Sequence, residues 1–140
     1  MTALTANRDT PARTGALGSL AVAAATNIFA GSIVCKAASG FATKGATALN
    51  LVALGRATRH IDNSAGADGD AIVTYEPGCF ALANAAGADE ITAADIGSDC
   101  YIVDDQTVAK TNGGGTRSRA GVIEGLDDSG AVWVWLGVQY

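Results

Sequence analysis

The residue types best suited to chemistry are few and widely spaced in this chain. It has three cysteines, Cys35, Cys79 and Cys100, and one histidine, His60. Zinc sites usually take cysteine ligands with about two to four residues between them, so cysteines this far apart predict no zinc site. A lone histidine with no evident nucleophile gives no basis for acid–base catalysis. We expect the cysteines to be small buried apolar residues and His60 to lie on the surface.

A glycine-rich stretch and several acidic pairs are the remaining candidates for a site. Residues 112–116 lack the Gly-Lys-Ser/Thr sequence with which a phosphate loop holds a nucleotide, so we interpret them as a mobile hairpin tip. The acidic pairs lack the alternating ligands and closing glutamate of a calcium loop, and residues 127–130 are typical of a tight turn. These pairs stand at positions 68 and 70, 104 and 105, and 127 and 128.

Glycoside hydrolysis by paired carboxylates depends on their separation in space, which the sequence leaves open. Only 6% of the residues are aromatic, however, and such a chain is a poor candidate for lining a sugar groove. We therefore expect a protein that is not an enzyme and that uses no metal and no cofactor.

Composition excludes further classes of protein. The 140 residues suffice for one domain, and the 29 alanines among its apolar residues predict a thin core that would gain from association. No run of 18 strongly apolar residues exists, so we expect no membrane partner. A pI near 4.6 argues against a nucleic-acid partner, and three widely spaced cysteines suit a reducing compartment. Residues 15–25 superficially resemble a secretion signal, but they hold few strong hydrophobes, and we interpret them as the end of an arm.

Charge is divided unevenly along the chain. Residues 1–60 carry six basic groups and one acidic group, whereas residues 61–140 carry three basic groups and thirteen acidic ones. The division fits two faces of one domain, a basic arm that meets an acidic neighbour, or solvated loops that differ by chance.

The amino-acid sequence predicts an all-β fold. Residues 1–19 show no sustained period and contain Pro11, so we expect an extended N-terminal arm. Residues 20–140 read as a single β-rich domain, a small sandwich or barrel of short strands between Gly and Asp/Asn turns. One helical turn is expected, with Thr92 as N-cap, Asp95 three residues later and Gly97 as terminator. The expected strands cover residues 20–24, 28–37, 41–44, 50–58, 71–76, 79–83, 100–104, 107–110, 121–125 and 131–136.

The last of these strands, residues 131–136, is the most informative. Alternation places Val132, Val134 and Leu136 on one face and Trp133 and Trp135 on the other, with no polar residue on either. Both faces therefore need cover. We expect the valine face to lie in the core and the tryptophan face to contact another copy of the chain, although a fully internal strand would show the same pattern.

In order and spacing, stretches along nearly the whole chain resemble the decoration (cement) proteins on the heads of tailed siphoviruses. Position 79 and the second tryptophan, at 135, depart from the usual pattern. The matching stretches are ALTANRDTP at 3–11, IFAGSIV at 28–34, VALGRA at 52–57, DNSAG at 62–66, GCF at 78–80, ITAADIG at 91–97, CYIVDDQTVA at 100–109, AGVI at 120–123 and VWV at 132–134.

The resemblance implies a β-rich homotrimer that binds the outer surface of a phage head at three-fold and quasi-three-fold positions and stabilises it. Its partners would be the major capsid protein and copies of itself, on a virion assembled in the bacterial cytoplasm. From position and residue type we expect Leu4, Arg8, Pro11 and Arg13 to contact the capsid. The alternative is an adhesion module on the virion surface whose exposed hairpin tips, such as residues 112–119, bind host cells or glycans.

Overall fold

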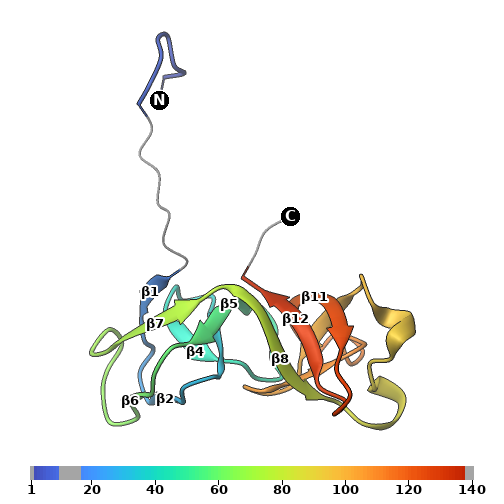
Figure 1. Ribbon diagram of the computed structural model, residues 1–140. Helices are drawn as coiled ribbons and strands as arrows, with labels where there is room; N and C mark the ends of the chain where they lie inside the picture. Colours follow the sequence, from blue (N-terminus) through green and yellow to red (C-terminus); the bar gives the residue numbers. More distant parts are fainter. Residues whose placement is uncertain (1, 10–16, 138–140) are drawn as a thin grey trace.

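The computed structural model describes residues 2–9 and 17–137, and it confirms the all-β class. Its regular elements are short strands and two single turns of 3₁₀ helix (Figure 1). The strands are β1 (Gly18–Ala21), β2 (Thr26–Ile28), β3 (Ile33–Lys36), β4 (Ala42–Lys44), β5 (Val52–Ala57), β6 (Ile61–Asn63), β7 (Ile72–Glu76), β8 (Gly78–Asn84), β9 (Asp99–Ile102), β10 (Thr107–Ala109), β11 (Arg119–Leu126) and β12 (Val132–Leu136), and the 3₁₀ turns are η1 (Gly87–Asp89) and η2 (Ala93–Asp95).

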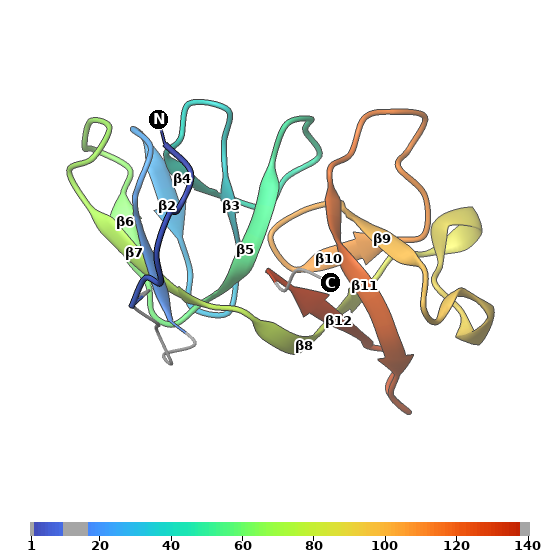
Figure 2. The same ribbon diagram turned by 90° about the horizontal axis from the view of Figure 1, so that it is seen from above.

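The strands form two lobes that lie side by side (Figures 1 and 2). Residues 17–77, the sheet lobe, form an antiparallel sheet in the order β1-β7-β5-β3-β4, together with the separate pair β2-β6. Residues 78–137, the barrel lobe, form a closed barrel in the order β10-β8-β12-β11-β9. The chain passes from one lobe to the other through Pro77, which separates β7 from β8. The architecture thus contains both an open sheet and a barrel.

Two hydrophobic clusters hold the lobes together, and β3 contributes to both. Because successive side chains point to opposite faces of a strand, Ile33 and Cys35 pack against the barrel while Val34 packs within the sheet lobe. Ala53 of β5 joins the barrel cluster as well. One face of the sheet therefore closes the barrel core, so the two lobes share packing.

The predicted helical turn is confirmed. Residues 93–95 form η2, and the backbone N–H of Thr92 donates to the carboxylate of Asp95 at 2.8 Å. Gly97 follows with a φ of +91°, a backbone conformation that glycine adopts without strain. The turn η1, which the sequence analysis did not foresee, precedes it.

Some strand boundaries differ from the prediction. The expected strand at 28–37 is two strands, β2 and β3, because residues 29–32 turn the chain, with Gly31 at a φ of +86°. The first strand begins at Gly18, two residues earlier than expected, and Ser19 pairs with Thr74 of β7. A short strand, β6, lies where only a turn was expected.

A substitution at Gly121 tests how closely β11 and β12 pack where the barrel closes. A Cβ at this position would overlap the backbone carbonyl of Trp135 on the neighbouring strand, whereas a Cβ at Gly125 of the same strand would meet nothing. We expect Gly121→Ala to lower the free energy of unfolding by about 2–3 kcal/mol, because the backbone of β12 must shift. Gly125→Ala should stay within about 0.5 kcal/mol of the parent. Urea unfolding of the two variants measures the difference; equal stabilities would contradict this account of closure.

Candidate interaction surface

Strand β12 divides its side chains between the barrel core and the outside. Val132, Val134 and Leu136 are fully buried, as predicted, while Trp133 remains 38% exposed and Trp135 is half-buried. This division follows from closure, since β12 pairs with β8 on one side and β11 on the other. The two tryptophans therefore lie on the outer side of the barrel.

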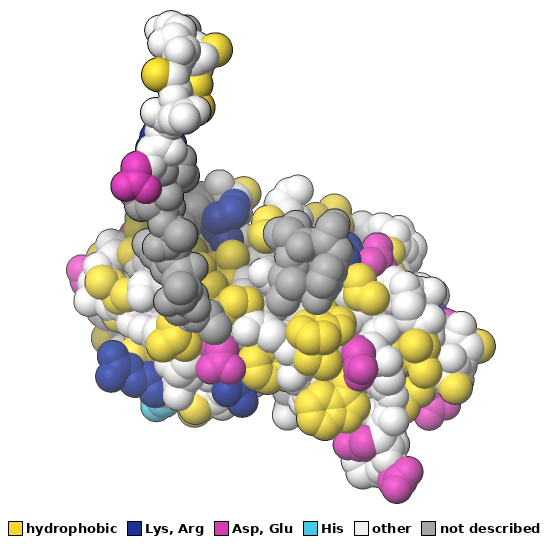
Figure 3. Space-filling model, turned by 45° about the horizontal axis from the view of Figure 1, so that its top comes forward, with side chains coloured by type: hydrophobic (Ala, Val, Ile, Leu, Met, Phe, Trp, Pro, Cys, Tyr) yellow, Lys and Arg dark blue, Asp and Glu magenta, His cyan; other side chains and the backbone are white. Residues whose placement is uncertain are grey.

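The strands beside β12 extend this outer surface with apolar residues. Across the ladder, Trp135 lies opposite Cys79 of β8 and Val122 of β11, and Trp133 lies opposite Ala81. We call these five residues the Trp face. Ala81 is exposed, and Cys79 and Val122 are half-buried. Figure 3 shows large hydrophobic side chains on this part of the molecule, with acidic side chains close to them.

Acidic residues border the Trp face. Glu124 sits at the irregularity in the β11–β12 pairing and is exposed, and Asp128 is exposed in the turn between these strands. Burial first, and then the negative charge of Glu124, raise the pKa of the Cys79 thiol, which places the Glu124 carboxylate near that side of β8. The chain has no Lys or Arg from 120 to 137, so the strands and the turn that carry Glu124 and Asp128 supply no positive charge beside them.

A groove of about 240 Å³ joins the Trp face to the sheet lobe. It is lined by Trp135 and Gly137, by Arg119 and Ala120 of β11, and by residues 51–53 at the start of β5. Arg119 is held there by an ion pair with Asp99, with 2.8 Å between Nε and Oδ1. Val52 in the groove wall is 44% exposed, so the apolar surface continues past the edge of the barrel.

Of the residues predicted to contact the capsid, the structure describes Leu4 and Arg8, and these do not lie beside the tryptophans. Residues 2–9 are exposed and stand apart from both lobes (Figure 1), with Leu4 exposed at 72%. Arg8 lies in the same segment. Pro11 and Arg13 fall outside the residues that the structure describes. The structure thus separates Leu4 and Arg8 from Trp133 and Trp135.

The cysteines and the histidine behave as the sequence predicted, with one exception. Cys35 and Cys100 are buried, and burial raises the pKa of each thiol to about 12, so both are inert apolar residues. Cys79 is the exception, because it is only half-buried and lies on the Trp face. His60 is exposed, but its ring stacks on Phe29 with 4.8 Å between the centroids. Sequence reasoning missed this pair because its members are 31 positions apart.

The acidic pairs are used by turns. The carboxylate of Asp68 accepts the backbone N–H of Ala24, and that of Asp104 accepts the N–H of Gln106. Asp127 accepts from the N–H and hydroxyl of Ser129, which confirms the predicted turn. Within residues 2–9 and 17–137, no group of three or more His, Cys, Asp or Glu side chains is placed to hold a metal ion.

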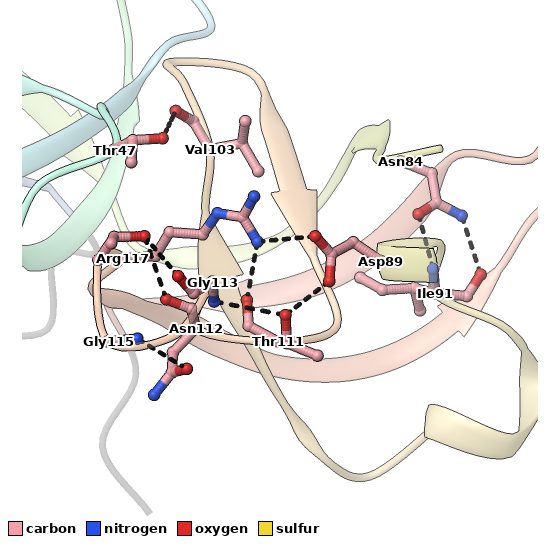
Figure 4. A network of polar contacts seen from close by, with 11 residues as sticks. Thr47, Asn84, Asp89, Ile91, Val103, Thr111, Asn112, Gly113, Gly115 and Arg117 are labelled. Atoms are coloured by element: carbon pink, nitrogen blue, oxygen red, sulfur yellow. Dashed lines mark hydrogen bonds and ion pairs between the residues drawn. The ribbon is translucent and has the colours of Figure 1, made fainter. Parts of the chain in front are cut away.

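The glycine-rich stretch is an anchored loop, and the prediction of a hairpin tip is wrong, because the strands on either side of it, β10 and β11, do not pair with each other. Arg117 lies behind it and donates to the Asp89 carboxylate at 3.1 Å and to the carbonyl of Thr111 at 3.1 Å (Figure 4). The Thr111 hydroxyl also donates to Asp89. At the tip, the Asn112 side chain accepts the N–H of Gly115. This clasp ties the loop to η1, and the sequence held no signal for it because Asp89 and Arg117 are 28 residues apart.

Comparison of the chain with protein-family models found no match, and comparisons with curated proteins and with solved structures found none either. Among the described residues, no helix has the length and apolar character needed to cross a membrane.

The clasp predicts a specific dependence on pH. The Thr111 hydroxyl first, and then Arg117, hold the pKa of Asp89 below its ordinary value of 3.8. A depressed folded-state pKa contributes stability above the unfolded pKa, and this contribution is lost as the pH falls through the folded-state pKa. Thr111→Val should raise the pKa of Asp89 towards 3.8 and should cost stability at neutral pH, with the cost shrinking as the solution is acidified below pH 3.8.

An NMR titration of the Asp89 carboxyl carbon, with urea unfolding at several pH values, measures both effects. Thr116→Val is the matched control, because the Thr116 hydroxyl bonds only to backbone carbonyls of the same loop. A Thr111→Val protein in which Asp89 titrates as in the parent would refute the role given to the hydroxyl.

Proposed function

We propose that the chain is a structural virion protein that binds the outer surface of a tailed-phage head as a homotrimer, at three-fold and quasi-three-fold positions, and stabilises the capsid. The observation that carries this proposal is the Trp face, where Trp133 of β12 is 38% exposed and lies beside the half-buried Trp135 and further apolar residues. The resemblance of the sequence to phage decoration proteins supplies the identity of the capsid partner.

The Trp face supports association between copies. Aromatic residues are enriched in the cores of protein interfaces, and tryptophan is among the residues that contribute most to binding. The residues on β12 that point the other way fill the barrel core, and Trp133, which points outward, is 38% exposed in one copy. Association would remove this apolar surface from water.

The N-terminal segment supports a contact with a second kind of partner. Leu4 and Arg8 are exposed on a segment that stands away from the lobes, a position from which they can reach a neighbouring surface. A trimer presents three such segments. Once one is bound, the others bind at an effective concentration on the order of mM, so avidity can exceed a single contact by about 10²–10⁴.

Substitutions in the N-terminal segment test the capsid contact. We expect the double variant Leu4→Asp, Arg8→Glu to lose binding to expanded shells of the same phage's major capsid protein, because it replaces an apolar and a basic contact with acidic ones. Co-sedimentation of purified protein with shells that lack it measures saturation, expected near one trimer per three-fold or quasi-three-fold position. Asn7→Ala, in the same exposed segment, is the control and should bind normally.

Undiminished binding by the double variant would move the capsid contact to the folded lobes. If the parent chain binds no shells but adheres to host cells or a glycan array, the capsid proposal is wrong and the adhesion function takes its place.

Removal of one tryptophan tests self-association. Trp133→Thr places a residue of high strand propensity in the strand and should weaken association at least about tenfold, since interface tryptophans commonly contribute more than about 1.4 kcal/mol. Sedimentation velocity over a range of concentrations measures this. Ile72→Thr, which changes another exposed apolar strand residue, on the sheet lobe, is the matched control. If both variants associate like the parent, the Trp face is not the subunit contact.

A further inference from the structure

We propose that the Trp face of one copy docks on a patch around Phe29 on the sheet lobe of the next copy, so that copies join head to tail. The Phe29 patch consists of Phe29, Arg59 and His60 with the groove beside Phe29. The inference rests on the self-association proposed above and adds the surface that opposes the tryptophans, which neither the resemblance nor the alternation of β12 supplies.

The Phe29 patch is an exposed aromatic surface held in a fixed shape. Phe29 is 54% exposed although its ring stacks on that of His60, with 13° between the ring planes. Nε2 of His60 lies 2.6 Å from Oδ1 of Asn27, which fixes the imidazole. The side chains are thus ordered before any partner arrives, and their docking costs little conformational entropy.

Arg59 gives this patch its free positive charge. It is exposed, and among the described residues it forms none of the ion pairs, which involve Arg56, Arg117 and Arg119. The nearby carboxylate of Asp62 is turned onto Ser64, whose N–H donates to it at 3.0 Å. Figure 3 shows the histidine side chain next to basic side chains at the end of the sheet lobe.

A groove of about 250 Å³ beside Phe29 can receive an aromatic side chain. Its lining includes Ala30, Gly31 and Ser32, with Asp105 and Gln106 at its polar side. Trp133, the more exposed of the two tryptophans, needs an acceptor for its indole N–H when it is buried, and the side-chain oxygens of Asp105 and Gln106 are acceptors. Tryptophans that fill pockets of this mixed kind are typical anchors of protein interfaces.

The charges of the two surfaces are complementary where Arg59 would meet Glu124 and Asp128, while Asp105 in the groove would serve as an acceptor for the indole N–H. The Trp face is bordered by Glu124 and Asp128 with no basic residue near them in the sequence, and the Phe29 patch presents Arg59. The imbalance extends to the whole barrel lobe, which has nine acidic and three basic residues between 78 and 137, while the sheet lobe has four of each between 17 and 77. Docking of Arg59 against Glu124 and Asp128 would neutralise part of this excess.

The position of the surfaces requires two copies for each contact. The Trp face belongs to the barrel lobe, whereas Phe29, Arg59 and His60 belong to the sheet lobe, with Asp105 and Gln106 of the barrel lobe at the groove beside them. The lobes share a packed core, so the two surfaces of one copy cannot fold onto each other. One contact between unlike surfaces leaves the pair of copies with one free Trp face and one free Phe29 patch. Such a contact generates a ring when its rotation closes, and three copies related by 120° satisfy the proposed trimer.

Charge reversal in the full-length chain tests the pairing. We expect Arg59→Glu alone, and Glu124→Lys with Asp128→Lys, each to weaken association at least tenfold by sedimentation velocity, because like charges then face each other. Neither change touches Asp127, which holds the turn. Lys110→Glu, an exposed charge reversal away from both surfaces, is the control and should associate like the parent.

Combining the three reversals in one chain should restore trimers, because every contact again joins opposite charges. A variant weakened by misfolding could not be rescued in this way. Mixing the two weakened proteins should restore pairs of unlike chains but no closed ring of three, since an odd ring always brings two like chains together.

Two results would overturn the pairing and leave self-association intact: parent-like trimers from Arg59→Glu, or no restoration by the combined reversals. A parent chain that remains monomeric at all concentrations would overturn self-association in solution, and this inference with it. Binding to capsid shells is tested separately by the co-sedimentation experiment.

Discussion

Closure of the barrel around β12 is the constraint on which the rest of the structure depends. With β8 on one side and β11 on the other, β12 has no free edge, and alternation leaves each of its side chains only the core or the outside. Val132, Val134 and Leu136 fill a core in which isoleucines such as Ile102 and Ile123 pack with small residues such as Ala120 and Cys100. The same alternation that turns these three side chains inward sends both tryptophans to the outer side of the barrel.

This constraint explains why the sequence was most informative at the C-terminal strand. A period of two over six residues fixes both faces of a strand without knowledge of its neighbours, and the capping residues of the 92–97 turn act within a few residues of each other. Other features depend on partners far away in the chain. The clasp between Asp89 and Arg117 and the stack of Phe29 on His60 come from topology, which no local pattern contains. The division of residues 28–37 into β2 and β3 was missed for a related reason, because a continuous apolar run hides a turn when the turn residues are small.

The two lobes of the molecule differ in net charge. Two of the three basic residues of the barrel lobe, Arg117 and Arg119, are engaged locally with Asp89 and Asp99, and this leaves its acidic excess without internal compensation. The charge division along the chain therefore follows the two lobes, because most of the excess negative charge belongs to the barrel lobe. The division of the sequence at residue 60 only approximated the boundary between the lobes. Of the three explanations for that division, opposite faces of one folded unit agree best with the arrangement of the lobes.

The chain has few large apolar side chains, and it places several of them on its surface rather than in its core. Three of the strongest apolar anchors that the chain could place in a core, Trp133, Trp135 and Phe29, stand instead on its surface. In a monomer these residues would lower solubility without stabilising the fold, since exposed apolar patches of this kind promote association. In a ring each would be covered once, and the area removed from water would stabilise both the assembly and its small subunits, because whatever binds only the folded state adds to its stability by mass action. A chain so poor in large core residues thus gains from its partners the burial that its own interior lacks.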